Sequence, residues 1–223
     1  MNWTIPNILT ALRLIAAPAV VIATLAFQDP LSYWIALIIF VVAGLTDFVD
    51  GYLARLWKQE TAFGKMMDPI ADKTVVIMTL IALLVPFNFS ALIMIPTLVI
   101  IFREILVSGL REFLGNKSNL LSVTRLAKWK TSFQIIAICS LYIALLLNFY
   151  QMSSNDNVTG IQLSMILEKT PGNHSSLLLI ASIFLLWIAT ILTFLSGYEY
   201  LLKAIKFISE KNKNDQNTIL FMG

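Results

Sequence analysis

The sequence DFVDGYLARLWKQETAFGKMMDPIAD, residues 47–72, places four aspartates inside or next to apolar runs long enough to cross a bilayer. They are Asp47, Asp50, Asp68 and Asp72. An ionised group inside a bilayer is costly, and its presence indicates a functional site. The first two aspartates are three residues apart and the last two are four apart, so each pair lies on one face of a helix. The stretch therefore predicts two membrane helices whose acidic faces converge on a shared polar centre.

The residue types in this stretch favour one class of ligand. Carboxylates, with no His or Cys in residues 47–72, offer only oxygen donors, which suit Mg²⁺ or Mn²⁺ better than Zn²⁺ or copper. Gly51, Ala54 and Gly64 are small enough to let a bulky ligand approach the backbone. Arg55 offers a planar fork for phosphate. Together these residues indicate a phosphate ester held by a metal ion.

The spacing D-x2-D-G-x2-A-R-x8-G-x3-D-x3-D runs through residues 47–72 without a gap. It resembles the signature of the CDP-alcohol phosphotransferase family, and its eight fixed positions make a chance match improbable. The alternative is a set of buried ion pairs in an ordinary membrane bundle. That alternative is disfavoured because the four acids face only one cation at the fixed positions.

The resemblance implies roles for the residues of the motif. Asp47, Asp50 and Asp68 are expected to hold two divalent ions, Mg²⁺ or Mn²⁺. Asp72 is expected to act as the general base and also as a ligand of the second ion. The CDP portion of the substrate is expected to rest on the remaining motif residues, which are Gly51, Ala54, Arg55 and Gly64. The resemblance also implies a homodimer.

The composition indicates a membrane protein. Of the 223 residues, 58% are hydrophobic and only 13% are charged, which is too apolar for a soluble domain. The formal charge of +3 is too small and too dispersed to indicate a nucleic-acid partner. The single cysteine, Cys139, excludes an internal disulfide. We expect one membrane domain over residues 1–208, followed by a polar C-terminal tail over residues 209–223.

Six apolar runs have the length of a membrane-spanning helix, about 20 residues. They cover residues 5–27, 33–56, 64–86, 90–113, 128–150 and 176–202. With a cytoplasmic N-terminus, the basic residues of the connections and the tail gather inside, and the outer connections hold only Lys169. The sequence therefore predicts an all-α integral membrane protein with six transmembrane helices and both termini inside.

This topology sets the depth of the acidic pairs. Asp47 and Asp72 each lie about 12 Å from the inner end of their helices. We therefore expect a polar cavity that opens to the cytoplasm. The expected location is the inner membrane of a bacterium or an equivalent organelle membrane.

The opening stretch WTIPNILTALRLIAAP contains a second pattern. Its P-N-x-L-T-x-x-R spacing resembles the opening of bacterial members of the same family. The resemblance implies that Asn7, Thr10 and Arg13 contact the nucleotide or a lipid headgroup. The alternative for Arg13 is that it extends along the helix to the headgroups without a catalytic role.

A third informative stretch, FREILVSGLREFLG, carries Arg103 and Arg111 on one helix, and Lys128 and Lys130 follow it in the sequence. One reading is an ordinary ion pair between Arg103 and Glu104. The other is a basic pocket for an acceptor that carries a phosphate, formed by Arg103, Arg111, Lys128 and Lys130. The run R-E-I-x-V-S-G-L-R-E-F, followed by K-W-K-T, resembles family members whose acceptor is glycerol 3-phosphate. The resemblance implies that Ser108 belongs to the same pocket and donates a hydrogen bond. Lys73 is expected to point away from the acidic face and to balance charge.

The resemblance implies one reaction in the bilayer. The hydroxyl of glycerol 3-phosphate attacks the β-phosphorus of CDP-diacylglycerol, which yields CMP and phosphatidylglycerophosphate. Alternatives within the family are phosphatidylglycerol as the acceptor, as in a cardiolipin synthase, or inositol phosphate. A divalent-cation transporter is the alternative from another class, but it should carry acids along a full crossing path. The outer halves of the predicted helices carry almost none.

Overall fold

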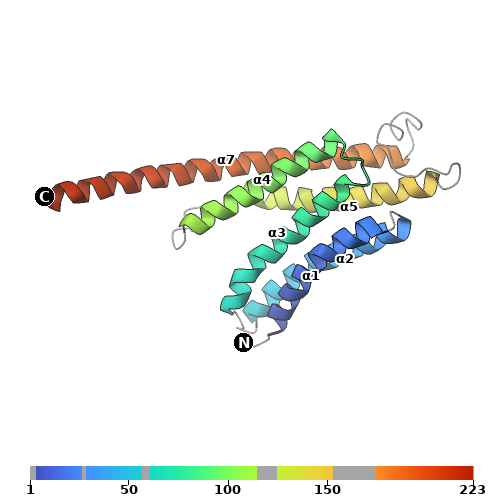
Figure 1. The fold of residues 1–223 in the computed structure, drawn as a ribbon, viewed down its shortest axis with the longest axis horizontal. Helices are drawn as coiled ribbons and strands as arrows, with labels where there is room; N and C mark the ends of the chain where they lie inside the picture. Colours follow the sequence, from blue (N-terminus) through green and yellow to red (C-terminus); the bar gives the residue numbers. More distant parts are fainter. Residues whose placement is uncertain (1–3, 27–28, 57–60, 115–124, 153–173, 223) are drawn as a thin grey trace.

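The computed structural model describes residues 4–26, 29–56, 61–114, 125–152 and 174–222. Within this part the chain is helical, and six helices follow one another along the sequence (Figure 1). They are α1 (Ile5–Ala26), α2 (Pro30–Leu56), α3 (Ala62–Leu84), α4 (Ala91–Leu114), α5 (Arg125–Met152) and α7 (His174–Met222). The prediction of an all-helical membrane fold is therefore confirmed.

Five of these helices contain segments that are long and apolar enough to cross a membrane. The segments are Ile5–Ala26, Pro30–Asp47, Ala91–Leu114, Trp129–Tyr150 and Ser175–Ser209. Helix α3 does not meet this description because its first half carries four charged residues, which are Lys65, Asp68, Asp72 and Lys73. The charged residues that lower the hydropathy of α3 thus include the predicted site residues Asp68 and Asp72.

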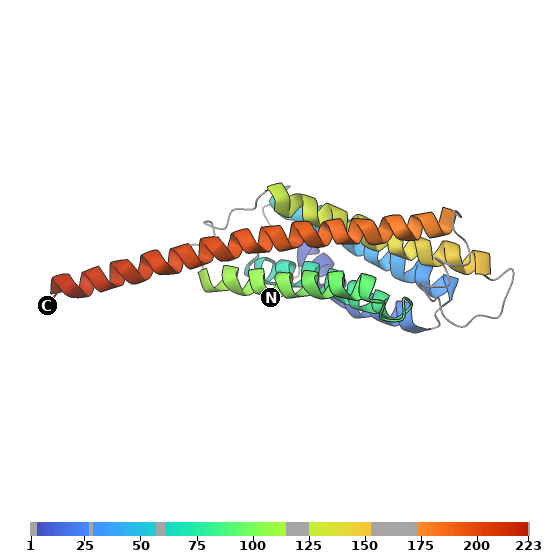
Figure 2. The same cartoon turned by 90° about the horizontal axis from the view of Figure 1, so that it is seen from above.

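The helices alternate in direction. Asn7, Thr10 and Arg13 of α1 contact successively later residues of α3, so these two helices run parallel. Helices α4 and α7 are also parallel, because Leu92 contacts Trp187 and Arg103 contacts Ser196 further along both helices. Helices that follow one another in the sequence run in opposite directions, as Figures 1 and 2 show.

Two polar caps fix where α2 and α3 begin. The backbone N–H of Ser32 donates to the Asp29 carboxylate at 2.7 Å, and the Asp29 N–H donates to the Ser32 hydroxyl at 3.1 Å, which is a capping box. The Ser32 hydroxyl is also the main cause of the lowered pKa of Asp29, because it donates to the ionised carboxylate. At α3, the hydroxyl of Thr61 accepts a hydrogen bond from the N–H of Gly64 at 3.0 Å.

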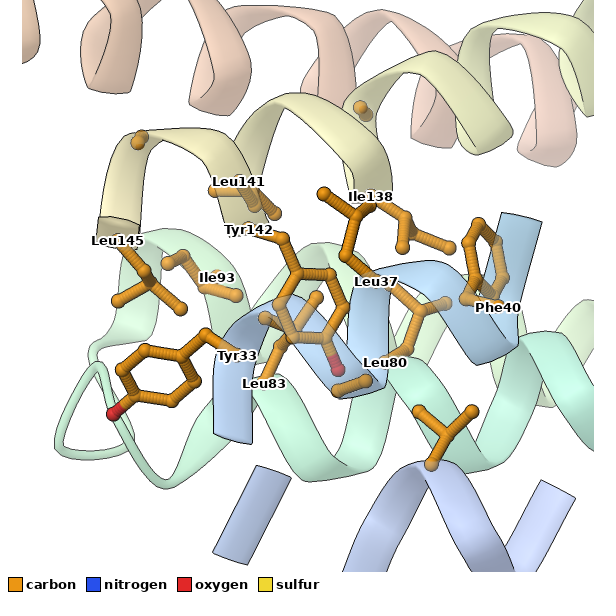
Figure 3. Close-up of a cluster of buried hydrophobic side chains, with 14 of the residues drawn as sticks. Tyr33, Leu37, Phe40, Leu80, Leu83, Ile93, Ile138, Leu141, Tyr142 and Leu145 are labelled. Atoms are coloured by element: carbon orange, nitrogen blue, oxygen red, sulfur yellow. The ribbon is translucent and has the colours of Figure 1, made fainter. Parts of the chain in front are cut away.

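The apolar core contains residues from all six described helices and lies at the end of the bundle away from the charged residues. Figure 3 shows its labelled side chains: Tyr33, Leu37 and Phe40 of α2, Leu80 and Leu83 of α3, Ile93 of α4, and Ile138, Leu141, Tyr142 and Leu145 of α5. The buried phenol of Tyr142 is satisfied by the hydroxyl of Thr24, 2.7 Å away on α1. Burial of these apolar groups holds the helices in place around the polar end.

Helix α7 is longer than the predicted span of 176–202. It contains 49 residues and therefore extends about 70 Å, roughly twice the thickness of a bilayer's hydrocarbon core. Figures 1 and 2 both show its C-terminal part projecting beyond the other helices. The helix continues through most of the segment predicted as a polar tail, because helix formation there depends on backbone hydrogen bonds and does not need an apolar sequence.

Candidate active site

A row of polar contacts links the first halves of α1 and α3. The hydroxyl of Thr61 donates to the side-chain oxygen of Asn7 at 2.8 Å. One turn further on, the hydroxyl of Thr10 donates to Asp68 at 2.7 Å. The α1 residues are spaced by three and the two helices run parallel, so successive side chains on one face of α1 meet residues progressively further along the chain, from the α3 N-cap Thr61 to Asp68.

Arg13 ends this row and ties three helices together. Its Nη1 donates to Oδ1 of Asp47 on α2 at 2.9 Å and also to Oδ1 of Asp72 on α3. Two acids that are 25 residues apart in the sequence therefore converge on one nitrogen atom. Arg13 is only 2% exposed, so it is buried in the bundle and does not extend to lipid headgroups.

The two carboxylates remain open although their arginine partner is buried. The side chain of Asp47 is 49% exposed and that of Asp72 is 41% exposed. An exposed carboxylate keeps lone pairs that a ligand can use, because each carboxylate accepts about four hydrogen bonds or metal contacts. The acids are thus held in place from one side and accessible from another.

The acids of this row offer oxygen donors to a divalent ion. Within the described side chains, no three acidic, histidine or cysteine residues come close enough together to form a metal site. Asp47 and Asp72 nevertheless converge, and Asp68 lies one helical turn before Asp72. All three offer oxygen atoms, which is the chemistry that Mg²⁺ and Mn²⁺ require. The donor atoms of these residues are therefore of the type that binds such an ion.

Gly64 of α3 lies next to Asn7 of α1 in this row. A Cβ atom at this position would lie 2.9 Å from the side-chain oxygen of Asn7 and 3.3 Å from the hydroxyl of Thr61. A side chain at this position therefore requires the end of the Asn7 side chain to shift. Among the residues predicted to bind CDP, Asn7 and Gly64 lie next to each other, and the hydroxyl of Thr10 is hydrogen-bonded to Asp68.

Several predicted site residues cannot be placed. The side chains of Asp50, Gly51, Ala54, Arg55 and Lys128 lie outside the described part of the structure. Their roles stay predictions.

A second polar cluster surrounds Glu104 of α4. One carboxylate oxygen of Glu104 accepts from Nη1 of Arg103 at 3.3 Å and from Nζ of Lys130 on α5. The ion pair considered for Arg103 is therefore present. Lys130 joins the same acid, as its assignment to a common basic pocket with Arg103 requires.

Lys73 of α3 also reaches this cluster. Its ammonium group donates to the hydroxyl of Ser108, which in turn donates to the carbonyl of Glu104 at 2.6 Å. The expectation that Lys73 points away from the acidic face holds, but Lys73 has a defined partner on α4. Because Lys73 directly follows Asp72, it joins the acidic row to the basic cluster, and the charges of Asp72 and Glu104 both act on it.

Helix α7 completes the basic cluster with residues that the spacing patterns do not single out. Arg103 donates to the hydroxyl of Ser196 at 3.0 Å, and Arg111 donates to the phenol oxygen of Tyr200 at 3.3 Å. Ser196 and Tyr200 are four residues apart and share a helix face. Two hydroxyl-bearing residues on one face of an apolar helix are a signal that sequence analysis can use.

The described residues of this cluster carry a surplus of positive charge. The cluster holds four cations and one acid, Glu104, and Asp72 of the acidic row also acts on one of these cations, Lys73. The four cations are Lys73, Arg103, Arg111 and Lys130. The two buried cations, Arg103 and Lys130, share a single acid, so the cluster favours an anionic ligand such as a phosphate group.

Known proteins resemble this chain over most of its length. Residues 3–202 match the family model described as CDP-alcohol phosphatidyltransferase. A protein of Cereibacter sphaeroides is 44% identical over 220 residues, which cover 95% of this chain and 100% of the relative. A protein of Rickettsia bellii is 38% identical over 200 residues, covering 90% of this chain and 94% of the relative.

A third relative, from Haemophilus influenzae, is 37% identical over 206 residues, covering 90% of this chain and 93% of the relative. All three relatives carry the name CDP-diacylglycerol--glycerol-3-phosphate 3-phosphatidyltransferase. The family model covers most of the chain and the relatives match nearly its full length. The chain belongs to the CDP-alcohol phosphatidyltransferase family.

Proposed function

We propose that this protein transfers the phosphatidyl group of CDP-diacylglycerol to glycerol 3-phosphate, releasing CMP and phosphatidylglycerophosphate. The observation that carries the proposal is the direct junction between an open acidic site and a positively charged cluster, made by the neighbours Asp72 and Lys73. The names of the relatives from three bacteria support the same reaction.

The acidic row is the site for the diphosphate of the donor. Asp47, Asp50, Asp68 and Asp72 would hold two Mg²⁺ or Mn²⁺ ions. When bound, such ions supply Lewis-acid polarisation of the phosphorus and neutralise charge on the departing CMP. Arg13 holds Asp47 and Asp72 toward each other, and the hydroxyl of Thr10 orients Asp68. These contacts fix the carboxylates before a substrate arrives.

The CDP portion rests against the ends of α1, α2 and α3. The residues proposed for this role are Asn7, Thr10, Gly51, Ala54, Arg55 and Gly64. The close approach at Gly64 supports the assignment, since it leaves backbone and small polar groups next to Asp68. The diacylglycerol chains stay in the lipid beside the bundle.

Asp72 is the proposed general base. Its carboxylate accepts the proton of the acceptor hydroxyl as the oxygen attacks the β-phosphorus and the bond to CMP breaks. The phosphate of glycerol 3-phosphate then lies in the basic cluster, bound by Arg103, Ser108, Arg111, Lys128 and Lys130. Because Lys73 spans the two sites, an acceptor held by its phosphate presents its hydroxyl to Asp72.

The membrane arrangement follows from the alternating helices. We infer that α3 crosses the bilayer together with the five apolar segments, so that six spans of alternating direction put both termini on one side. The excess of Lys and Arg in the connections favours the cytoplasmic side. We infer a polar cavity open to the cytoplasm of a bacterial inner membrane. A homodimer is part of the same proposal and is implied by the family alone.

The test is CMP release from CDP-diacylglycerol by the purified protein in lipid nanodiscs with Mg²⁺. Glycerol 3-phosphate, phosphatidylglycerol, inositol phosphate and serine are compared as acceptors, with no acceptor as the baseline. We expect release above the baseline only with glycerol 3-phosphate. Release with a different acceptor would replace the proposed substrate, and release with none of them would remove the enzymatic proposal.

A further inference from the structure

The ring of Tyr200 lies between the two arginines of α4. The guanidinium carbon of Arg103 is 5.5 Å from the ring centroid and that of Arg111 is 5.4 Å from it. Both distances are within the range in which the negative face of an aromatic ring attracts a cation. The two arginines are eight residues apart, so an ideal helix separates them by about 80° and leaves room for one ring against both.

This ring has a fixed place in the bundle. Tyr200 is only 1% exposed and packs with the buried residues Val107 and Leu114 of α4. Its phenol oxygen accepts the hydrogen bond from Arg111. A ring that is enclosed in this way does not reach a substrate, and its effect on the reaction must act through the arginines.

Arg103 also rests on the backbone of α7. A Cβ atom at Gly197 would lie 2.8 Å from Cγ of Arg103 and 3.6 Å from its Nε, so this contact requires glycine. Next to Gly197, the hydroxyl of Ser196 accepts from Nη2 of Arg103. Within the described part of the chain, Nε of Arg103 is buried and has no hydrogen-bond partner. One N–H of this guanidinium is therefore left for a further acceptor atom.

The ring of Tyr200 offsets the repulsion between Arg103 and Arg111. Two guanidinium groups near each other repel, and Glu104 contacts only Arg103 of the two. The ring offers both of them a partner without adding a negative charge that would compete with a phosphate. The arginines are thus held in place while their charge remains available to an anion.

We propose that Ser196, Gly197 and Tyr200 form a seat on α7 that positions Arg103 and Arg111 for the phosphate of the acceptor. The seat is a set of positioning residues that determines the affinity for the acceptor and leaves the affinity for CDP-diacylglycerol unchanged. This inference rests on the proposed function, because it assigns the basic cluster to the acceptor.

The first test replaces Tyr200 and measures steady-state kinetics of CMP release in nanodiscs, with each substrate varied in turn. For Tyr200→Leu we expect KM for glycerol 3-phosphate to rise about tenfold, which corresponds to about 1.4 kcal/mol. We expect KM for CDP-diacylglycerol to stay within about twofold. Tyr200→Phe keeps the ring and should recover most of the loss, with KM within about threefold of the wild type.

The second test uses two glycines as a matched pair. Gly197→Ala should raise KM for glycerol 3-phosphate several-fold because the new methyl group displaces Arg103. Gly109→Ala, on α4, places its methyl group in open space and should leave both KM values unchanged. This pair decides the question if Tyr200→Leu does not fold, since each change adds one methyl group to a helix.

Three results would overturn the inference. One is an equal rise of both KM values in Tyr200→Leu, which indicates general damage to the bundle. Another is a normal KM for glycerol 3-phosphate in folded Tyr200→Leu, and the third is a Gly197→Ala protein that behaves like Gly109→Ala. A wild-type protein that needs no glycerol 3-phosphate would instead overturn the proposed function, and the same kinetic series detects it.

Discussion

The acidic row and the basic cluster hold their charged groups in opposite ways. In the acidic row the arginine is buried and the two acids that it contacts are about half exposed. In the basic cluster Arg103 and Lys130 are buried, and the acid between them is shared. The first arrangement leaves carboxylate oxygens open for a ligand at all times. The second leaves cations that an incoming anion must reach by competing with Glu104.

The two clusters draw on different helices, so under the proposed function each substrate contacts its own part of the bundle. The acidic row is built from α1, α2 and α3, and the basic cluster from α3, α4, α5 and α7. Only α3 belongs to both, through Asp72 and Lys73. Changes on either side should therefore affect one substrate, and changes at the junction should affect the chemical step.

The largest effect is expected at the junction itself. Asp72→Asn removes the proposed base while it keeps the shape of the side chain, so turnover should fall about 10²- to 10⁴-fold with little change in the binding of CDP-diacylglycerol. The measurement is kcat together with a titration of nucleotide binding. Asp29→Asn is the control, because asparagine also caps a helix and Asp29 lies outside the site. Near-normal turnover of Asp72→Asn would exclude the base.

A smaller loss is expected when the acids lose their common partner. Arg13→Lys keeps the positive charge but replaces the planar guanidinium that Asp47 and Asp72 share. We expect kcat to fall about 100-fold, since small displacements of catalytic groups have effects of this size. KM for glycerol 3-phosphate should change little. An altered acceptor KM with normal kcat would place Arg13 in the other cluster.

An effect on one substrate alone is expected from the basic cluster. Arg111→Ala removes a charged contact to the acceptor phosphate, which is worth about 1.5–3 kcal/mol, so KM for glycerol 3-phosphate should rise at least about tenfold. KM for CDP-diacylglycerol should rise much less. The two KM values are obtained from the same initial-rate assay, and an equal rise in both would contradict the assignment of Arg111.

The mildest change is expected at the contact between α1 and α3. Gly64→Ala brings a methyl group to 2.9 Å from the side-chain oxygen of Asn7, so the Asn7 side chain must move. KM for CDP-diacylglycerol should rise about threefold, equivalent to roughly 0.6 kcal/mol, while the acceptor KM stays normal. Gly44→Ala adds the same group in open space on α2 and serves as the control. Identical kinetics for the two variants would remove Gly64 from the donor site.

The convergence of Asp47 and Asp72 was predictable because helix geometry is local. The rise per residue and the direction of two successive helices suffice to put both acids at one depth. The partner of these acids was not predictable in the same way. An arginine near the start of an apolar helix suits either a headgroup contact or a buried ion pair, and only the packing of α1 against α2 and α3 distinguishes them for Arg13.

The length of α7 was missed for a different reason. Hydropathy measures which residues prefer lipid, and it gave an end near residue 202. Helix formation follows backbone hydrogen bonding and continues to Met222 through polar residues. The end of a helix and the end of its membrane-spanning segment are set by different properties, so they need not fall at the same residue.

By itself, the sequence determined the class of protein, the approximate helix positions and the family motif, and it predicted which charged residues form the site. These features depend on composition and on short, fixed spacings along one or two helices. Only the tertiary structure decided that Arg13 joins Asp47 to Asp72, that Lys73 reaches Ser108, and that Tyr200 lies against two arginines. Those contacts join residues 34 to 97 positions apart, and the packing of the apolar core sets which helix faces meet.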